Sequence, residues 1–323
     1  MAVNPSRRRG REDRFFRLGT GFFAFLVVLL VAGIAFELWR ESRLSIAKFG
    51  LGFWKTSTWD PVAGNFGALP FIWGTLYSSF LALLISTPVA LGIAIFLSEL
   101  SPRPLRTPLA FLTELLAAIP SIVYGLWGVF VLVPLVRKLE VLTPAWARKL
   151  PLFSGPPLGV GMLSAALILA VMVIPFTSSV AREVLKAVPV TQREAAYALG
   201  ATRWEAILVA LRYGRTGILG AIILGLGRAI GETMAVTMVI GNSPTVTPSL
   251  FAPQYTMAAV IANEFTEAAD DLYLSALIEI GLVLFAITLV INILSRLLIW
   301  SVNREVRAGE PKRAAPATAG APA

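Results

Sequence analysis

The chain has 323 residues, of which 56% are hydrophobic and 15% are charged, and its mean hydropathy is +0.75. Soluble domains carry about 25% charged residues, so this composition excludes an ordinary soluble globular protein. The formal charge is +9, and the chain contains no histidine and no cysteine. Disulfides, thiol nucleophiles and thiolate metal sites are therefore excluded, and the commonest acid-base group and metal ligand is missing.

Hydropathy predicts six membrane spans. A bilayer core of roughly 30 Å is crossed by about 20 apolar residues in a helix, and a lipid-exposed backbone must satisfy its own hydrogen bonds. Suitable windows occur at 18–36, 71–98, 115–136, 158–181, 217–240 and 272–295. They predict an all-α integral membrane protein with one domain at 18–303. A basic segment at 1–17 precedes this domain, and an Ala/Pro-rich tail at 304–323 has the composition of a disordered segment.

The first span follows the Arg-rich start RRRGREDR, as a secretory signal would. Its apolar stretch is longer than the roughly 7–15 residues of a signal core, and no A-x-A cleavage site follows it. We therefore interpret it as a retained helix.

Polar and helix-bending residues interrupt several of the later spans. Pro88, Pro120 and Pro175 fall inside the second, third and fourth spans and are expected to kink them. Three carboxylates, at Glu114, Glu232 and Glu279, lie in or beside three different spans. Nothing in the sequence brings two of them together, so it offers little material for a membrane enzyme.

Basic residues indicate the orientation. Nineteen of the 28 Lys and Arg residues lie in the N-terminal segment, the 99–107 loop, the 182–215 loop and the C-terminal end, whereas eight lie in the segments of the opposite face. The positive-inside rule places both termini and the 182–215 loop in the cytoplasm. The net charge is thus mainly a topology signal, and the basic N-terminus lacks the aromatic residues or known fold that nucleic-acid binding would require.

The loop at 182–215 contains the polar stretch QREAAYALGATRWEAI, between two of the most hydrophobic segments. Thr191 and Glu194 have the spacing of a capping box that begins one helix, and Thr202 and Glu205 have that spacing for a second. Gly200 lies between them, where a residue with positive φ ends a helix. Ala195, Ala196 and Ala198 give the first helix a small-residue surface that a partner backbone can approach. The alternative is a pair of amphipathic helices lying on lipid.

The fifth span contains Gly227 and Gly231, a small-xxx-small pair that allows close helix packing. Arg228 and Glu232 are spaced i, i+4 and are expected on one helix face. Charges within a bilayer are costly and usually pair or face a cavity. The glycine spacing around Gly225 is one residue too long for a dinucleotide fingerprint, and no strand precedes it.

Glu194-Ala195-Ala196, followed after three residues by Gly200, resembles the EAA loop of binding-protein-dependent ABC importer permeases. That resemblance implies a type I importer permease fold (MetI-like) in which Glu194, Ala195, Ala196 and Gly200 belong to a coupling helix that docks on a cytoplasmic ATPase. The EAA loop, here residues 182–215, often continues to I-x-L-P. This sequence has Ala210-Leu211-Arg212-Tyr213 there and lacks the proline.

Further segments narrow the resemblance to the phosphate-specific importers. These are GLGRAIGETMAVTMVIGN at 225–242, IANEF at 261–265, ALIEIGLVLF at 276–285 and FIWGTLYSSFLALLISTP at 71–88. They resemble the C subunit of the permease pair rather than the A subunit. The implied partners are a homologous second permease, an ATPase subunit dimer, a periplasmic phosphate-binding protein, phosphate and membrane lipid. The sequence contains no Walker motif, so ATP would be used by the partner ATPase and the chain would need no cofactor of its own.

For such a permease, Arg228 is a candidate for contacting the anionic substrate, because a guanidinium fork suits phosphate oxygens. Glu232 would then hold Arg228 in place and balance its charge. The alternative is a self-neutralising ion pair that only locks helix packing.

Two other classes remain open at this point. One is an importer permease for another oxyanion such as molybdate or sulfate, and the other is a membrane enzyme or stand-alone channel. The acidic outer segment at 242–272 is interpreted either as a solvated loop or as a contact for the binding protein.

Overall fold

The computed structural model describes residues 5–308, and within that range the chain is helical with no β-strand, only two isolated bridges. The α-helices in chain order are α1 (Pro5–Glu41), α2 (Arg43–Phe49), α3 (Leu69–Ile95), α4 (Arg103–Ala118), α5 (Ser121–Trp127), α6 (Val133–Leu142), α7 (Ala145–Arg148), α8 (Met162–Ala187), α9 (Val190–Ala198), α10 (Arg203–Tyr213), α11 (Arg215–Ile230), α12 (Met234–Thr237), α13 (Met257–Glu264) and α14 (Asp271–Ala308). π-Helical segments follow α3 at Phe96–Leu100 and α5 at Gly128–Leu132.

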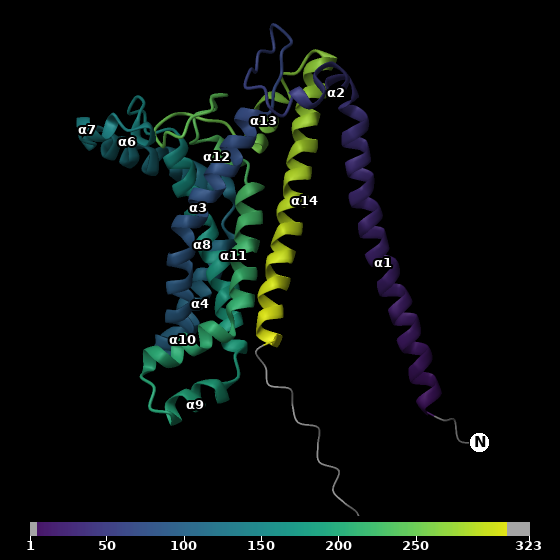
Figure 1. The fold of residues 1–323 in the computed structure, drawn as a ribbon, viewed down its shortest axis with the longest axis vertical. Helices are drawn as coiled ribbons and strands as arrows, with labels where there is room; N and C mark the ends of the chain where they lie inside the picture. The colour runs from purple at the N-terminus through teal and green to yellow at the C-terminus, as the bar shows by residue number, and fades with distance from the viewer. Residues whose placement is uncertain (1–4, 309–323) are drawn as a thin grey trace, which may run out of the picture.

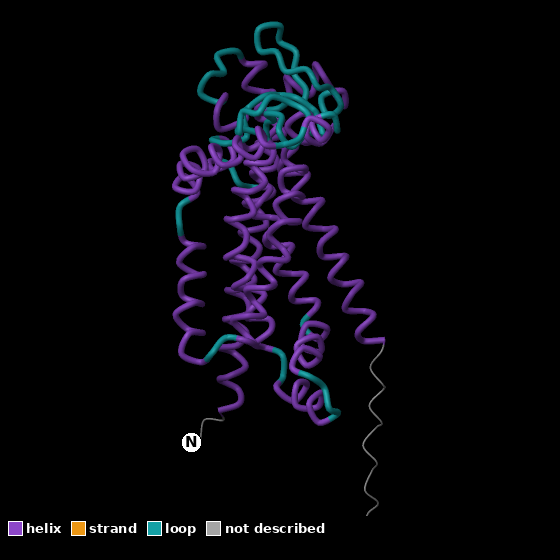
Figure 2. The backbone as a smooth tube through the Cα atoms, turned by 90° about the vertical axis from the view of Figure 1, so that its left-hand side faces the viewer, coloured by secondary structure: helices purple, strands orange, loops and turns teal. Residues whose placement is uncertain are grey.

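The long helices α3, α8, α11 and α14 stand side by side in one bundle, and α1 stands apart from it (Figure 1). Helices α9 and α10 lie at one end, which we call the EAA end, and the first described turns of α1 and the last of α14 also reach that end. The other end, which we call the opposite end, gathers α2, α6, α7, α13 and most of the connecting loops (Figure 2). The expectation that both termini and the 182–215 loop share one side therefore agrees with the described residues.

Five helical stretches are long and apolar enough to cross a membrane, and the pair α10 and α11 provides a sixth if it is counted as one bent span. This agrees with the expected all-α membrane fold. The helical ends differ from the sequence estimate at both termini. Helix α1 already begins at Pro5 and α14 continues to Ala308, so neither 17/18 nor 303/304 is a break in structure. The expected disorder of 309–323 lies outside the described residues.

Pro88 and Pro175 lie inside α3 and α8, as expected, but the third span is built differently. Helix α4 ends at Ala118, and Pro120 precedes the first residue of α5. Proline lacks an N–H and disfavours helix at the residue before it, so Pro120 separates two helices and does not kink one. The expectation of one kinked helix over 115–136 is therefore wrong.

The interior of the bundle is formed by α8, whose buried positions include Ile168, Leu169 and Val173, with α3, α5 and the α12 region packed around it. A second cluster at the opposite end joins Phe53, Phe66 and Phe71 to α13 and the start of α14. Helix α1, in contrast, has no buried residue in its most apolar window and diverges from the bundle toward the EAA end (Figure 1). Its apolar surface is thus left for lipid or another subunit.

The first turns of α3 make the closest backbone contact of the opposite end. A Cβ built on Gly74 lies 2.1 Å from the carbonyl oxygen of Tyr255. A Cβ built on Gly92, in the same helix, would meet nothing within 4 Å. Only glycine fits at position 74, because the backbone of Tyr255 occupies the space that a side chain would need.

We therefore predict that Gly74→Ala lowers the stability of the folded protein by about 1–3 kcal/mol through overpacking, whereas Gly92→Ala is neutral or slightly stabilising because alanine is the better helix former. The measurement is the thermal unfolding of the two detergent-solubilised variants beside the wild type. Equal melting temperatures for both variants would contradict the contact.

Candidate functional site

The EAA loop folds into two helices joined at Gly200. Gly200 has φ +85°, and a Cβ at this position would meet nothing within 4 Å. The prediction of a positive φ is therefore confirmed, and the requirement for glycine comes from backbone conformation and not from crowding.

The two predicted capping boxes have different outcomes. In the second, the Glu205 N–H donates to Thr202 Oγ1 (3.4 Å) and the Thr202 N–H donates to Glu205 Oε2 (2.7 Å), so the prediction is confirmed. The first is wrong: α9 begins at Val190, its cap residue is Pro189, and no side chain caps it. Proline fixes φ near the helical value, which starts the helix one residue before Thr191.

The exposed surface of α9 is smaller than the alanine pattern predicted. Glu194, Ala195 and Ala198 are exposed, and Glu194 has no ion pair among the described residues. Ala196 is buried against its own chain, with an exposed fraction of 9%, so it does not offer a surface to a partner. Leu199, beside Gly200, is 90% exposed. Sequence reasoning missed this exposed apolar side chain.

The chain leaves the EAA loop through a bend of 69° between α10 and α11. The bend is at Gly214, where a Cβ would lie 3.3 Å from the Ala210 oxygen and from Val184 Cγ1 of α8. A small residue packed on α8 thus makes the turn here, at the position just after the family's I-x-L-P segment, which in this chain lacks the proline.

The predicted fifth span does not continue through 217–240. Helix α11 ends at Ile230, Gly231 closes it, and a short helix α12 begins at Met234. The expected placement of Arg228 and Glu232 on one helix face is therefore wrong, because Glu232 lies beyond the helix end. Discontinuous helices of this kind commonly border substrate sites in transporters, where protein covers the freed backbone groups.

Arg228 occupies the last turn of α11, where a cation also interacts favourably with the helix dipole. Its Nε is buried without a hydrogen-bond partner, and among the described residues it forms no ion pair with Glu232. The guanidinium carbon lies 5.8 Å from the ring centroid of Phe176 in α8, and its charge also acts on Tyr124 of α5. Within residues 5–308, therefore, no carboxylate pairs with Arg228.

Glu232 has a different contact. Its Oε1 accepts a 3.4 Å hydrogen bond from the Ala235 N–H, in the first turn of α12. A carboxylate at a helix start is favoured by the free N–H groups there. The structure thus assigns Glu232 to the beginning of α12, and its expected role in holding Arg228 in place is wrong.

Small residues mediate close packing of α11 on α8, but they are not Gly227 and Gly231. Both of these are exposed, and a Cβ on Gly227 would meet nothing within 4 Å, so among the described residues no helix packs on this pair and its packing role stays a prediction. The contact with α8 uses Gly217 and Gly225, whose Cβ atoms would lie 2.7 Å from Val184 and 2.5 Å from Thr177. Ala221, halfway between them, is buried on the same face.

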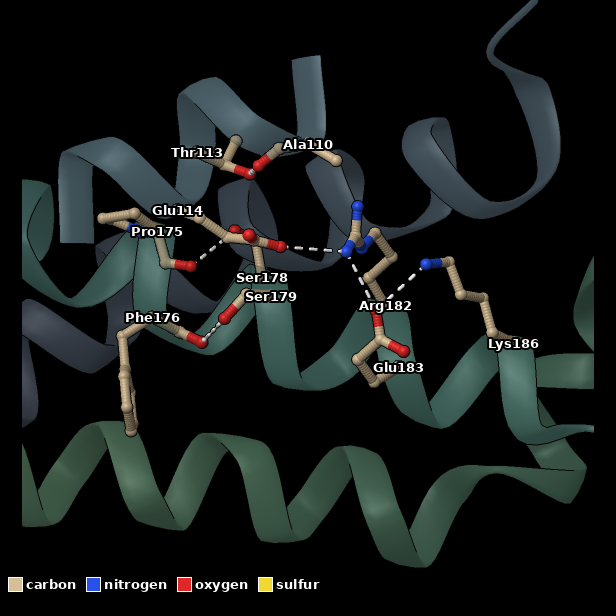
Figure 3. Close-up of polar contacts among 10 residues, drawn as sticks. All are labelled: Ala110, Thr113, Glu114, Pro175, Phe176, Ser178, Ser179, Arg182, Glu183 and Lys186. Atoms are coloured by element: carbon tan, nitrogen blue, oxygen red, sulfur yellow. Dashed lines mark hydrogen bonds and ion pairs between the residues drawn. The ribbon is translucent and has the colours of Figure 1, made fainter. Parts of the chain in front are cut away.

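Of the three membrane carboxylates, Glu114 lies near the EAA end and pairs with Arg182 of α8 at 3.1 Å. Arg182 also contacts Glu183 at 2.9 Å, and Lys186 contacts Glu183 at 3.0 Å, so four charges form one chain of ion pairs (Figure 3). The ring of Phe176 points away from this network, toward α11 (Figure 3). Glu114 is therefore tied to the surface network at the EAA end.

Glu279 is 3% exposed and lies in α14, which packs against α2, and its Oε2 is buried without a hydrogen-bond partner. In the outer segment, Glu264 Oε2 accepts hydrogen bonds from Trp59 Nε1 (2.8 Å) and Tyr273 Oη (2.6 Å). Glu264 thus fastens the outer loops together and is not part of a solvated acidic surface.

Comparison with known proteins decides the family. The family model for binding-protein-dependent transport system inner membrane components matches residues 90–307, which include the EAA loop and the broken helix α11–α12. The chain belongs to this family. Its members are transporter permease subunits of ABC importers and not enzymes, and the chain is accordingly a multi-pass membrane component of an ABC system.

Curated relatives cover almost the whole chain. The chain is 46% identical to the phosphate transport system permease protein PstC of Mesorhizobium japonicum over 303 residues, covering 92% of this chain and 93% of that protein. It is 49% identical to PstC of Pasteurella multocida, covering 91% and 93%. A probable PstC of Methanocaldococcus jannaschii is 38% identical, covering 91% and 95%.

A solved structure supports the fold. The permease chain of the inward-facing MetNI methionine ABC transporter superposes with a TM-score of 0.55 at 16% identity, covering 72% of this chain and 94% of that chain. At this identity the likeness concerns the fold alone, and it confirms the expected MetI-like architecture.

The geometry of the EAA loop leads to a prediction at Gly200. Gly200→Val should abolish substrate transport while leaving the protein in the membrane, because a β-branched residue resists the left-handed conformation by about 1–2 kcal/mol or more. Gly200→Asn is the control, since asparagine tolerates that conformation, and it should retain most activity. Transport is measured against membrane abundance, and normal transport by the valine variant would remove the coupling interpretation of this turn.

Proposed function

We propose that the chain is the permease subunit of an ATP-driven importer of inorganic phosphate. The observation that carries this proposal is the 46–49% identity, over more than 90% of both chains, to permeases named for phosphate transport. The segments at 225–242 and 261–285, which resemble the phosphate-specific C subunit, support the same substrate.

The subunit would line the translocation pathway together with a homologous second permease. The exposed face of α9, with Glu194, Ala195 and Leu199, would dock on a cytoplasmic ATPase dimer, which binds and hydrolyses ATP. A periplasmic phosphate-binding protein would deliver the substrate to the opposite end. In this proposal the complex lies in the inner membrane of the cell, and the EAA end and both termini face the cytoplasm. The concentration of basic residues at that end supports this orientation.

Arg228 is the residue we assign to the anion. It lies at a helix break, and among residues 5–308 no carboxylate forms an ion pair with it. Phosphate passing the break would provide that charge, with the planar fork of the guanidinium matching two phosphate oxygens. Glu232, at the start of α12, would set the shape of the pathway beside it.

The proposal is tested by radiolabelled phosphate uptake in a strain from which this chain has been deleted. A plasmid copy of the wild type should restore uptake, and an excess of unlabelled molybdate or sulfate should compete poorly. Restoration of molybdate or sulfate uptake in place of phosphate uptake would replace the proposed substrate, and recovery of the complex without any ATPase would contradict an ABC permease.

A further prediction tests whether Arg228 binds the anion or only contributes to helix packing. If Arg228 and Glu232 had only packing roles, Arg228→Gln combined with Glu232→Gln would keep transport, because the described residues show no ion pair between them to break and glutamine retains most of the bulk of each side chain. We expect the double variant to assemble normally and to transport no phosphate, and Arg228→Lys to be impaired because an ammonium lacks the fork. Uptake is compared with membrane abundance, and wild-type uptake by the double variant would reduce both residues to packing roles.

A further inference from the structure

An ion pair between Glu99 and Arg193 joins two parts of the chain that are 94 residues apart. Arg193 Nη2 lies 2.6 Å from Glu99 Oε1, and Arg193 Nε lies 3.2 Å from Glu99 Oε2. The two side chains are 17% and 13% exposed, and among the described ion pairs this is the one in which both partners are largely buried. A bidentate, partly buried pair is stronger and more directional than a surface pair.

The pair lies where four elements meet at the EAA end. Arg193 belongs to α9, and it also donates to the carbonyl oxygens of Leu185 (2.9 Å) and Val188 (3.0 Å) at the end of α8. Glu99 belongs to the π-helical segment that ends α3, and its carbonyl oxygen accepts a 2.7 Å hydrogen bond from Arg203 of α10. Both helices of the EAA loop are thus attached to the end of α3 through one residue.

The far end of α3 is attached just as firmly to the loop at 245–257. Trp73 Nε1 donates to the Thr247 oxygen (3.0 Å), and Tyr77 Oη donates to the Pro248 oxygen (2.8 Å). The Met257 N–H donates to Thr75 Oγ1 (2.9 Å), beside the close contact of Gly74.

This loop follows α12 and lies at the opposite end of the bundle, away from α9 and α10 (Figure 1). Helix α3 has 27 residues and is therefore about 40 Å long.

We propose that α3 is a rigid helix that transmits displacement of the ATPase-docking helix α9 to the loop at 245–257. The Glu99–Arg193 pair is the contact through which α9 moves α3, and we call this contact the joint. A helix packed along α8 for much of its length moves as a unit, so a pull on Glu99 reaches Gly74 with little loss. The π-helical turn that carries Glu99 is a type of segment that recurs at functional positions. The inference rests on the proposed function, because it assumes that an ATPase moves α9.

The first experiment uses the complete complex, purified and reconstituted in proteoliposomes, with phosphate uptake and ATP hydrolysis measured in the same vesicles. In Glu99→Ala the joint to α3 is lost, while Arg193 keeps its two bonds to α8. We expect normal copurification of the ATPase, retained ATP hydrolysis and a loss of phosphate transported per ATP of at least about tenfold, a size typical of coupling free energies. Lys186→Ala, which removes an exposed ion pair at the same end of α8, is the matched control and should leave the ratio unchanged.

A loss of copurification, hydrolysis and uptake together in Glu99→Ala would mean that the pair only folds the EAA loop, and would overturn the proposal. An unchanged ratio would overturn it as well. If the wild-type complex itself binds no ATPase or takes up no phosphate, the proposed function fails instead, so the two failures are distinguishable.

The second experiment restores the joint without its charges. The chain has no native cysteine, so Glu99→Cys and Arg193→Cys can be combined in a complex whose other subunits carry no reactive thiol. A short bifunctional methanethiosulfonate reagent should restore coupled uptake, and reduction should abolish it again. Failure of the cross-linked protein to regain coupling, with the cross-link verified by mass spectrometry, would exclude a mechanical joint.

Discussion

A backbone inside lipid has no water to bond with, and the rest of this structure follows from that constraint. Long helices satisfy it in α3, α8 and α14, and at two of the interruptions elsewhere a side chain bonds the freed carbonyl oxygen. At the break between α4 and α5, Tyr124 Oη donates to the Leu116 oxygen at 2.7 Å. After α12, the Asn242 side-chain amide donates to the Thr237 oxygen at 3.0 Å. Interruptions are therefore placed where the fold can supply a donor.

Most of the buried charged groups are likewise paired with a partner of the same chain. Arg182 and Arg193 are held by carboxylates and helix-end carbonyls at the EAA end, where α8, α9 and α10 come together. Arg228 differs from both because it has no ion pair among the described residues, whereas a buried Nε without a hydrogen bond is found in Arg182 as well. Unpaired charges are costly in a membrane, and such residues usually pair or face a cavity. The contrast between the ion-paired arginines and Arg228 separates the residues that hold the fold from the residue that we assign to the substrate.

The two ends of the molecule are built for different tasks. The opposite end is stiffened by an aromatic cluster in which Phe66 stacks on Tyr273 and Trp59 packs edge-on against Phe71. The EAA end has a smaller apolar cluster, which includes Leu185 and Ile218, and is further held by hydrogen bonds and ion pairs. Long helices join these ends, so a rearrangement at the EAA end can displace the stiff loops at the other end as a unit.

Local sequence determined the membrane class, the positive φ of Gly200 and the capping box at Thr202, because hydropathy, glycine conformation and capping depend on near neighbours in the chain. The EAA pattern and the segments at 225–242 also identified the family without any coordinates. Only the tertiary structure decided where α11 ends: the residues beyond Ile230 are as apolar as a span requires, and what ends the helix is the packing of α12 and the capping of its start by Glu232. The tertiary structure also decided that Gly217 and Gly225 are the glycines that pack on α8. It likewise decided that Glu99 pairs with Arg193. Those contacts depend on which helix faces which, and the periodicity of a single helix carries no information about its neighbour.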